Sequence, residues 1–167
     1  RNYPSIVNDT CGLHVHMSFT NKLNYSRIMT PEFTPMMVEA LREFGIAEQI
    51  HESHCFWERL TNQNHPHCSH KYLGDKQVLM TRKDYHSRGT EHSRYTAINY
   101  CEGQHHTIEC RLLPMFDAPK QSVRAIMTVL DATNKFLSKI RSRELRNSAT
   151  VVSRPTVFQE LGTMVRS

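Results

Sequence analysis

The sequence predicts an α+β fold on three observations. Residues 13–19 alternate between apolar and polar side chains, which is the pattern of a half-buried strand. Two further strand-like runs, "RYTAINY" and "TIECRLLPMF", flank the short segment "CEGQHH", and this arrangement is typical of a β-hairpin. Two longer segments repeat apolar residues at helical spacing. We therefore expect one sheet of antiparallel strands with helices packed against it.

Composition indicates one globular domain. The chain has 167 residues, of which 38% are hydrophobic and 22% charged. It contains no apolar run near the about 18 residues that span a bilayer. The net charge of +5 and the isoelectric point of about 9.1 suit anionic partners such as nucleotides or nucleic acid without requiring them. Five irregularly spaced cysteines favour reduced thiols, and hence a cytoplasmic protein, over a disulfide framework.

The first strand places its polar residues on one face. In "CGLHVHMSF" the side chains of His14, His16 and Ser18 point to one side of the strand. The opposite, apolar side comprises Leu13, Val15 and Met17. Two imidazoles on alternate positions of a short apolar run therefore predict a polar face in front of a hydrophobic core.

Two helices are expected next to the sheet. The segment "TPEFTPMMVEALREFGIAEQI" predicts a helix over 35–52, with Thr34 as N-cap and Pro35 as the first helical residue. A longer amphipathic helix is expected over 119–145, because its apolar residues share one stripe. The stripe comprises Val123, Ile126, Met127, Leu130, Leu137 and Ile140. Within residues 53–92 the pattern is harder to read: "NQNHPHCSHKYLGDK" predicts a loop and "QVLM" a short strand. The histidine and arginine content of "RKDYHSRGTEHSR" predicts a mobile or ligand-facing loop.

The hairpin repeats the division into a polar and an apolar face. A loop over 102–106 places Asn99 opposite Glu109 and Ala97 opposite Arg111. The polar face of the second hairpin strand comprises Thr107, Glu109 and Arg111, and its apolar face comprises Ile108, Cys110 and Leu112. The sequence thus predicts one sheet whose polar face carries reactive groups from several strands.

The histidine, glutamate and arginine side chains of the polar face are types that bind phosphate or a metal ion. A neutral imidazole and a carboxylate can bind the same divalent cation, so His14 and Glu109 are candidate ligands of one metal ion. Arg111 offers a planar fork for phosphate or carboxylate, and His16 reaches a neighbouring point on the same face. Taken singly, a HxH strand is more often structural, and an ExR pair is more often an ion pair worth under about 1 kcal/mol. Together the residues favour phosphoryl transfer from a nucleotide.

The motifs also resemble a known family. "CGLHVHMSF", "RYTAINY" and "TIECRLLPMF", followed by a long helix, resemble the amidoligases of phages and bacteria over about residues 10–140. These are carboxylate–amine ligases related to glutamine synthetase. The resemblance implies a curved antiparallel sheet with helices packed behind it. It also implies an ATP-dependent reaction in which a carboxylate forms an acyl phosphate and an amine then displaces phosphate to give an amide.

The resemblance implies a role for each motif residue, with ATP and Mg²⁺ or Mn²⁺ as cofactors. His14 and Glu109 correspond to ligands of a shared metal ion. His16 and Ser18 correspond to contacts with ATP, and Arg111 corresponds to the group that stabilises the transferred phosphoryl group. His16, Glu109 and Arg111 are accordingly the candidate catalytic residues.

Residues of the preceding strand complete this set. Arg94 and Asn99 correspond to groups that hold phosphate or the substrate carboxylate. The domain is expected to span 1–146, as the C-terminal portion of the fold, with an irregular tail or a short helix over 147–167. The expected partners are a nucleotide and a carboxylate-bearing small molecule or peptide together with an amine.

One element of the family pattern is missing. Members open with a strand that carries acidic residues at alternate positions, whereas "RNYPSIVNDT" offers only Asp9. Because the chain begins with Arg1, we expect the acidic strand to lie ahead of it. The alternative is a degenerate ligase fold that serves as a binding or virion assembly component.

Two other classes of protein stay open. The histidine-rich segment contains zinc-type ligands, but their spacing matches no standard zinc finger, so a histidine-rich loop is favoured over a zinc module. Its candidate ligands are His54, Cys55, His65, His67, Cys68 and His70. The basic end of the long helix mildly favours nucleic-acid binding, but no alternation of aromatic and basic residues supports it.

Overall fold

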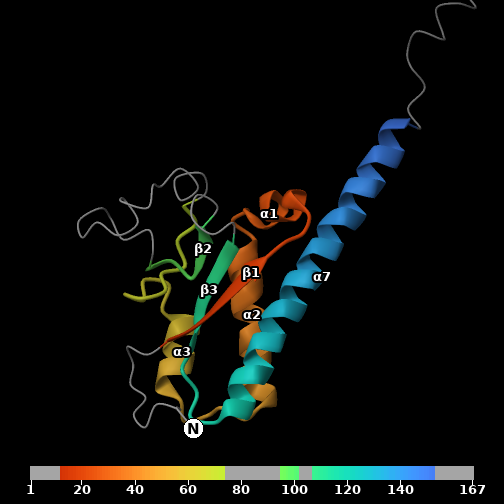
Figure 1. Cartoon of the computed structure of the whole chain (residues 1–167). Coiled ribbons are helices and arrows are strands. Elements are labelled where there is room, and N and C mark those ends of the chain that lie inside the picture. Colours follow the sequence, from red (N-terminus) through yellow and green to blue (C-terminus); the bar gives the residue numbers. More distant parts are fainter. Residues whose placement is uncertain (1–11, 74–94, 102–106, 153–167) are drawn as a thin grey trace, which may run out of the picture.

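The computed structural model describes residues 12–73, 95–101 and 107–152 (Figure 1). Within these ranges the chain forms an antiparallel sheet and four helices, so the α+β prediction is confirmed. The strands are β1 (Gly12–Ser18), β2 (Ile98–Cys101) and β3 (Thr107–Pro114). The helices are α1 (Lys22–Ile28), α2 (Phe33–Ala47), α3 (His54–Thr61) and α7 (Pro119–Val152). No helix in these ranges combines the length and the apolar character needed to cross a membrane.

The sheet has the strand order β1-β3-β2, with β3 in the centre. The predicted hairpin register is confirmed, because Asn99 lies opposite Glu109 and the Arg111 amide donates to the Ala97 carbonyl. On the other side of β3, His16 lies opposite Glu109. The run "RYTAINY" is a strand only from Ile98 onward, since Thr96 instead forms an isolated parallel bridge to Ser69. The register thus brings one residue from each strand into a single row.

Helix α2 differs from the predicted range of 35–52. It begins at Phe33, so Thr34 lies inside the helix rather than at its N-cap, and it ends at Ala47. The helix stops because Gln49 adopts a positive φ of 54° and the Ile50 amide turns back to the Gly45 carbonyl. This turn directs Ile50 into the core. The spacing of Ile50 from the preceding apolar residues is also that of a continuing helix, so spacing alone predicted a helix that is too long.

The sequence did not predict α1 and α3. Each is short and begins with a capping side chain: Asn21 accepts a hydrogen bond from the Leu23 amide, and Ser53 accepts one from the Phe56 amide. Helix α3 occupies residues for which the sequence predicted no element, and it ends just before the segment "NQNHPHCSHKYLGDK" that was predicted to be a loop. The expected "QVLM" strand lies outside the described residues.

Helix α7 is longer than predicted. It continues to Val152, so the prediction of an irregular tail from 147 is wrong as far as that residue, and residues 153–167 lie outside the description. At about 1.5 Å per residue its 34 residues span about 50 Å. In Figure 1 the helix therefore extends well beyond the sheet.

The buried stripe of α7 is rotated from the predicted one. Val123 and Met127 were expected in the core but are 59% and 51% exposed. Ala125, Val129 and Ala132 are buried instead. Small alanine side chains let the helix axis approach its neighbours closely, so this side faces the core even though the larger residues suggest otherwise.

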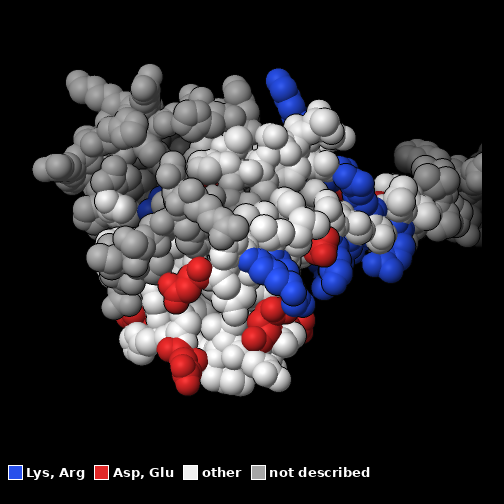
Figure 2. Space-filling model, turned by 60° about the horizontal axis from the view of Figure 1, so that its bottom comes forward, with Lys and Arg blue, Asp and Glu red and all other residues white. Residues whose placement is uncertain are grey.

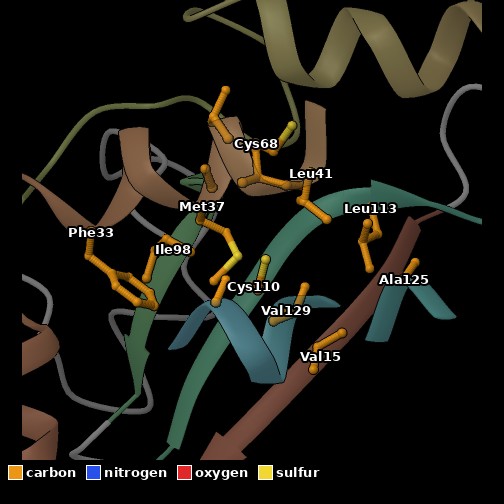
Figure 3. Packing of buried hydrophobic residues seen from close by; sticks show 14 of the residues in the cluster. Val15, Phe33, Met37, Leu41, Cys68, Ile98, Cys110, Leu113, Ala125 and Val129 are labelled. Carbon is orange, nitrogen blue, oxygen red and sulfur yellow. The ribbon is translucent and has the colours of Figure 1, made fainter. Parts of the chain in front are cut away.

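The core lies between the apolar face of the sheet and helices α2 and α7. Figure 3 shows Val15 of β1 and Cys110 of β3 in a cluster with Met37 of α2 and Val129 of α7. Cys110 is fully buried, as its apolar-face position predicted. Because this face is committed to packing, the opposite face of the sheet is left for polar side chains.

Candidate functional site

The polar face of the sheet centres on the carboxylate of Glu109. The side chain is only 4% exposed, yet four side chains contact it. His14 Nδ1 lies 2.9 Å and His16 Nε2 lies 3.6 Å from its Oε1 atom. Arg111 Nη1 donates to the same oxygen at 3.2 Å, and Asn99 Nδ2 donates to Oε2 at 2.7 Å. The antiparallel register thus brings residues more than 80 positions apart in the sequence, such as His14 and Asn99, into one cluster.

The environment of Glu109 keeps its carboxylate ionised. Burial alone would raise the pKa of the carboxyl group, but hydrogen bonds from His14 and Asn99 and the charge of Arg111 outweigh it. The net effect lowers the pKa from 4.5 to about 2. Glu109 is therefore a permanent negative charge at the centre of the cluster near neutral pH.

Asn99 is oriented by its own neighbour. Thr96 Oγ1 donates a hydrogen bond to Asn99 Oδ1, so the amide nitrogen is the atom that faces Glu109. Both Thr96 and Asn99 are buried. This makes Asn99 a fixed donor toward the carboxylate rather than a freely rotating polar group.

Arg111 is fixed in position by three contacts. Its Nε donates to the His67 carbonyl at 3.3 Å, its Nη1 contacts Glu109, and its guanidinium carbon lies 5.5 Å from the centre of the Tyr95 ring. The side chain is 12% exposed. A planar cation held in this way is pre-organised to bind an anion that reaches the face of the sheet.

A second arginine, Arg59, lies close to this cluster and was missed in the sequence. It is 1% exposed, and its Nη1 donates to the Arg111 carbonyl at 3.1 Å. A Cβ atom added to Gly12 would lie 3.4 Å from Arg59 Nη1 and 3.1 Å from His14 Nε2, so both side chains line the space above that glycine. The available signal was its spacing on α3, where it shares the buried stripe with Phe56 and Leu60.

One predicted site residue does not join the cluster, and a second lies outside the described residues. Ser18 is exposed at the end of β1 and lies opposite Thr107, one row away from Glu109. Arg94 lies outside the described residues, as do Asp9 and the "RKDYHSRGTEHSR" segment. The described cluster therefore contains His14, His16, Asn99, Glu109 and Arg111 of the predicted set.

A magnesium site is not complete within the described residues. They contain no group of three or more His, Cys, Asp or Glu side chains arranged to hold a metal ion. Glu109 is the cluster's one carboxylate in this part of the chain, and Mg²⁺ requires several oxygen ligands. The assignment of His14 and Glu109 as metal ligands stays a prediction.

The side chains considered for a zinc module are used in separate contacts. His65 Nδ1 lies 3.3 Å from Cys68 Sγ, whereas His70 Nε2 lies 2.9 Å from the Arg59 carbonyl oxygen. His54 is exposed and lies beside Glu58. Since the described residues form no metal-binding group, this geometry gives the zinc module no support.

The buried cysteines are poor nucleophiles. Burial raises the pKa of Cys68 to about 11, against the opposing charges of Arg59 and Arg111, and it raises the pKa of Cys110 to about 12. Both thiols are therefore protonated near neutral pH. These two thiols are therefore not suited to act as nucleophiles.

Fold and cluster together define an α+β protein with a basic, carboxylate-centred site on one face of a small antiparallel sheet. No family model matches the chain, and neither a curated protein nor a solved structure does.

Proposed function

We propose that the chain carries the phosphoryl-transfer site of a cytoplasmic ATP-dependent carboxylate–amine ligase of the amidoligase type. The observation that carries the proposal is the convergence on Glu109. Two histidines, an asparagine and an arginine, all in motifs that resemble this family, lie within 3.6 Å of one buried carboxylate. The core of Val15, Cys110 and Val129 lies on the other face of the sheet.

The proposed reaction has two steps. A carboxylate oxygen of the substrate attacks the γ-phosphorus of ATP, and the bond to ADP breaks to leave an acyl phosphate. An amine then attacks the acyl carbon, phosphate leaves, and the nitrogen releases a proton to solvent. Neither step requires a covalent bond to the protein, in keeping with the protonated state of the buried thiols.

The cluster residues suit the charge that develops in the first step. Arg111 is fixed beside the exposed His16, so both can donate to the oxygens of a phosphoryl group placed on the face of the sheet. Glu109 holds Arg111 and His14 in position, and Asn99 in turn holds Glu109. Arg59 adds a second buried cation beneath the same face.

Magnesium or manganese belongs to the proposal only through the family resemblance. When bound, such an ion neutralises the phosphate oxygens of ATP. Within the described residues, His14 and Glu109 do not by themselves supply enough oxygen ligands for it. Further oxygen ligands from outside the described residues would have to complete the site.

A second candidate function is a ligase fold that binds without catalysis, as a component of an assembly. The observation in its favour is that Glu109 is already neutralised by its own neighbours. A carboxylate that contacts an arginine, an asparagine and two histidines also fits a purely structural centre.

Turnover distinguishes the two functions. Purified protein is incubated with ATP, Mg²⁺ or Mn²⁺, a panel of amino acids and carboxylate-bearing peptides, and a panel of amines. ADP release and the mass of the amide product are then measured. A ligase gives ADP only when a carboxylate is present, and amide product only when an amine is added as well.

A matched pair of variants ties turnover to the site. Arg111→Lys is expected to lose most of the activity, because lysine cannot make the planar two-point contact. Arg42→Lys, an exposed arginine on α2, is the control and retains it. ADP and amide formation that is equal in both variants would remove Arg111 from the mechanism, and no product from any pair of substrates would favour the binding function.

A further inference from the structure

A polar cavity lies at the C-terminal end of β1, one row beyond the Glu109 cluster. It has a volume of about 380 Å³ and opens between the end of β1, helix α1 and the C-terminal half of α7. Its polar lining consists of Ser18, Thr20, Asn24, Asn134, Ser138 and Arg141. None of the residues that contact Glu109 lines it, so the two polar regions are built from different side chains.

Arg141 is held in the cavity by a neutral group. Its Nη2 donates to Asn24 Oδ1 at 3.1 Å, and Arg27 Nη1 donates to the same oxygen at 3.3 Å. Asn24 is 8% exposed, so this oxygen is a buried anchor for two cations. The carboxylate one turn further along α7, Glu144, is bound by Arg27 at 2.6 Å and 3.1 Å.

Arg27 and Arg141 differ in their hydrogen-bond partners. Arg27 binds the Glu144 carboxylate directly, whereas Arg141 interacts with Glu144 only through its charge and donates its hydrogen bond, within the described residues, to the Asn24 amide oxygen. The hydroxyl groups of Ser18, Thr20 and Ser138 stand around the same space. Ser138 Oγ donates its hydrogen to the Asn134 carbonyl at 2.9 Å, so Ser18 and Thr20 are the hydroxyl groups in this lining that can donate to a ligand. An oriented guanidinium beside these two hydroxyls, with a neutral group as its own acceptor, matches the contacts that a bound oxyanion makes.

We propose that this cavity binds a small molecule through a phosphate or carboxylate group, which pairs with Arg141. The apolar side chains of Phe19 and Leu137 in the lining provide contact for the remainder of such a ligand. The inference does not depend on the proposed ligase activity, because it uses no residue of the Glu109 cluster.

The charge of α7 favours anions in this region. Figure 2 shows Lys and Arg side chains gathered where α7 runs toward its C-terminal end. The exposed cations of this half of the helix are Lys135, Lys139, Arg141, Arg143 and Arg146. They raise the local concentration of anions, while the cavity beside Arg141 supplies a defined place to bind.

The test is an amide-resolved NMR titration of the protein with inorganic phosphate and, separately, with succinate, at constant ionic strength kept with sodium chloride. Either ligand is expected to give saturable shifts at residues 18–20 and 138–141. Saturation by phosphate alone or by succinate alone identifies the oxyanion. Shifts that stay linear in concentration, or that spread evenly over the basic half of α7, would overturn the proposal.

Variants assign the binding to the cavity. Arg141→Gln is expected to weaken binding about tenfold or more, since it removes a charge-assisted contact. Arg143→Gln removes an equal charge outside the cavity lining and leaves the affinity unchanged. Equal loss in both variants would mean non-specific attraction to the helix and would contradict the proposal.

Two further variants guard against misfolding and against confusion with the first site. Thr20→Val keeps the shape of the side chain and removes one hydroxyl of the lining, so it is expected to weaken binding by a smaller factor than Arg141→Gln. His16→Gln changes the Glu109 cluster and leaves binding at the cavity unchanged. Loss of phosphate binding in His16→Gln with retention in Arg141→Gln would place the anion at the cluster and overturn the inference.

Discussion

The Glu109 cluster and the Arg141 cavity use arginine in opposite ways. Arg111 is 12% exposed and lies against a buried carboxylate of its own chain, whereas Arg141 is exposed and contacts a neutral amide. The first arginine therefore contacts a carboxylate directly, whereas the carboxylate near Arg141, Glu144, is bound by Arg27. The difference indicates that the cluster is organised by its own electrostatics, while the cavity depends on what binds there.

The largest expected effect comes from removing the central charge of the cluster. Glu109→Ala leaves Arg111, His14 and Asn99 facing a buried gap, so it is expected to lower the free energy of unfolding by about 3–5 kcal/mol. Asn24→Ala removes only a neutral acceptor and is expected to cost about 1–2 kcal/mol. Urea denaturation of both variants measures the two values. Equal losses would mean that the two regions do not differ in the way described.

The next effect is a dependence of stability on pH. The pKa of Glu109 is lower in the folded chain than the ordinary 4.5, so the unfolded chain binds more protons in acid. The stabilisation is complete above about pH 5 and is lost as the pH falls toward about 2. It amounts to roughly 3 kcal/mol.

Denaturation curves collected between pH 7 and pH 2 for wild type and Glu109→Gln test this dependence. The variant is expected to lose less stability over the interval, since it lacks the titrating group. Asn24→Ala serves as the control and keeps the wild-type slope. Parallel curves for wild type and Glu109→Gln would show that this carboxylate does not titrate differently in the folded chain.

A smaller effect tests which side of α7 packs against the apolar face of the sheet. Val129→Ala is expected to cost about 1–3 kcal/mol, because Val129 is fully buried against the sheet. Met127→Ala is expected to change stability by no more than about 0.5 kcal/mol, because Met127 is half exposed. Thermal unfolding of the pair is sufficient. The reverse order would restore the stripe that the sequence predicted.

In this chain the alternation of apolar and polar residues predicted the strands better than the helical spacing of apolar residues predicted the helices. The alternation of His14, Val15 and His16 predicted both faces of β1, and the short loop predicted the pairing of Asn99 with Glu109. In a strand each residue belongs to one of two faces, so a single anchored residue determines the rest.

The helices were harder to predict for a physical reason. A helix can rotate by a few tens of degrees to bury alanines instead of larger residues, and α7 does so at Ala125 and Ala132. Arg59 was missed because a charged residue is not expected on a buried stripe, and only its contact with the Arg111 carbonyl reveals its role. The end of α2 depends on one positive φ, at Gln49, which no pattern of hydrophobicity encodes.

The most direct test of the central claim is the binding of a non-hydrolysable ATP analogue by isothermal titration calorimetry, with and without Mg²⁺. We expect saturable one-to-one binding to the wild-type chain, a loss of about tenfold or more in Arg111→Lys, and no loss in Arg42→Lys. Wild-type binding that is absent under every condition, or that is equally strong in Arg111→Lys, would contradict the assignment of the Glu109 cluster as the ATP site.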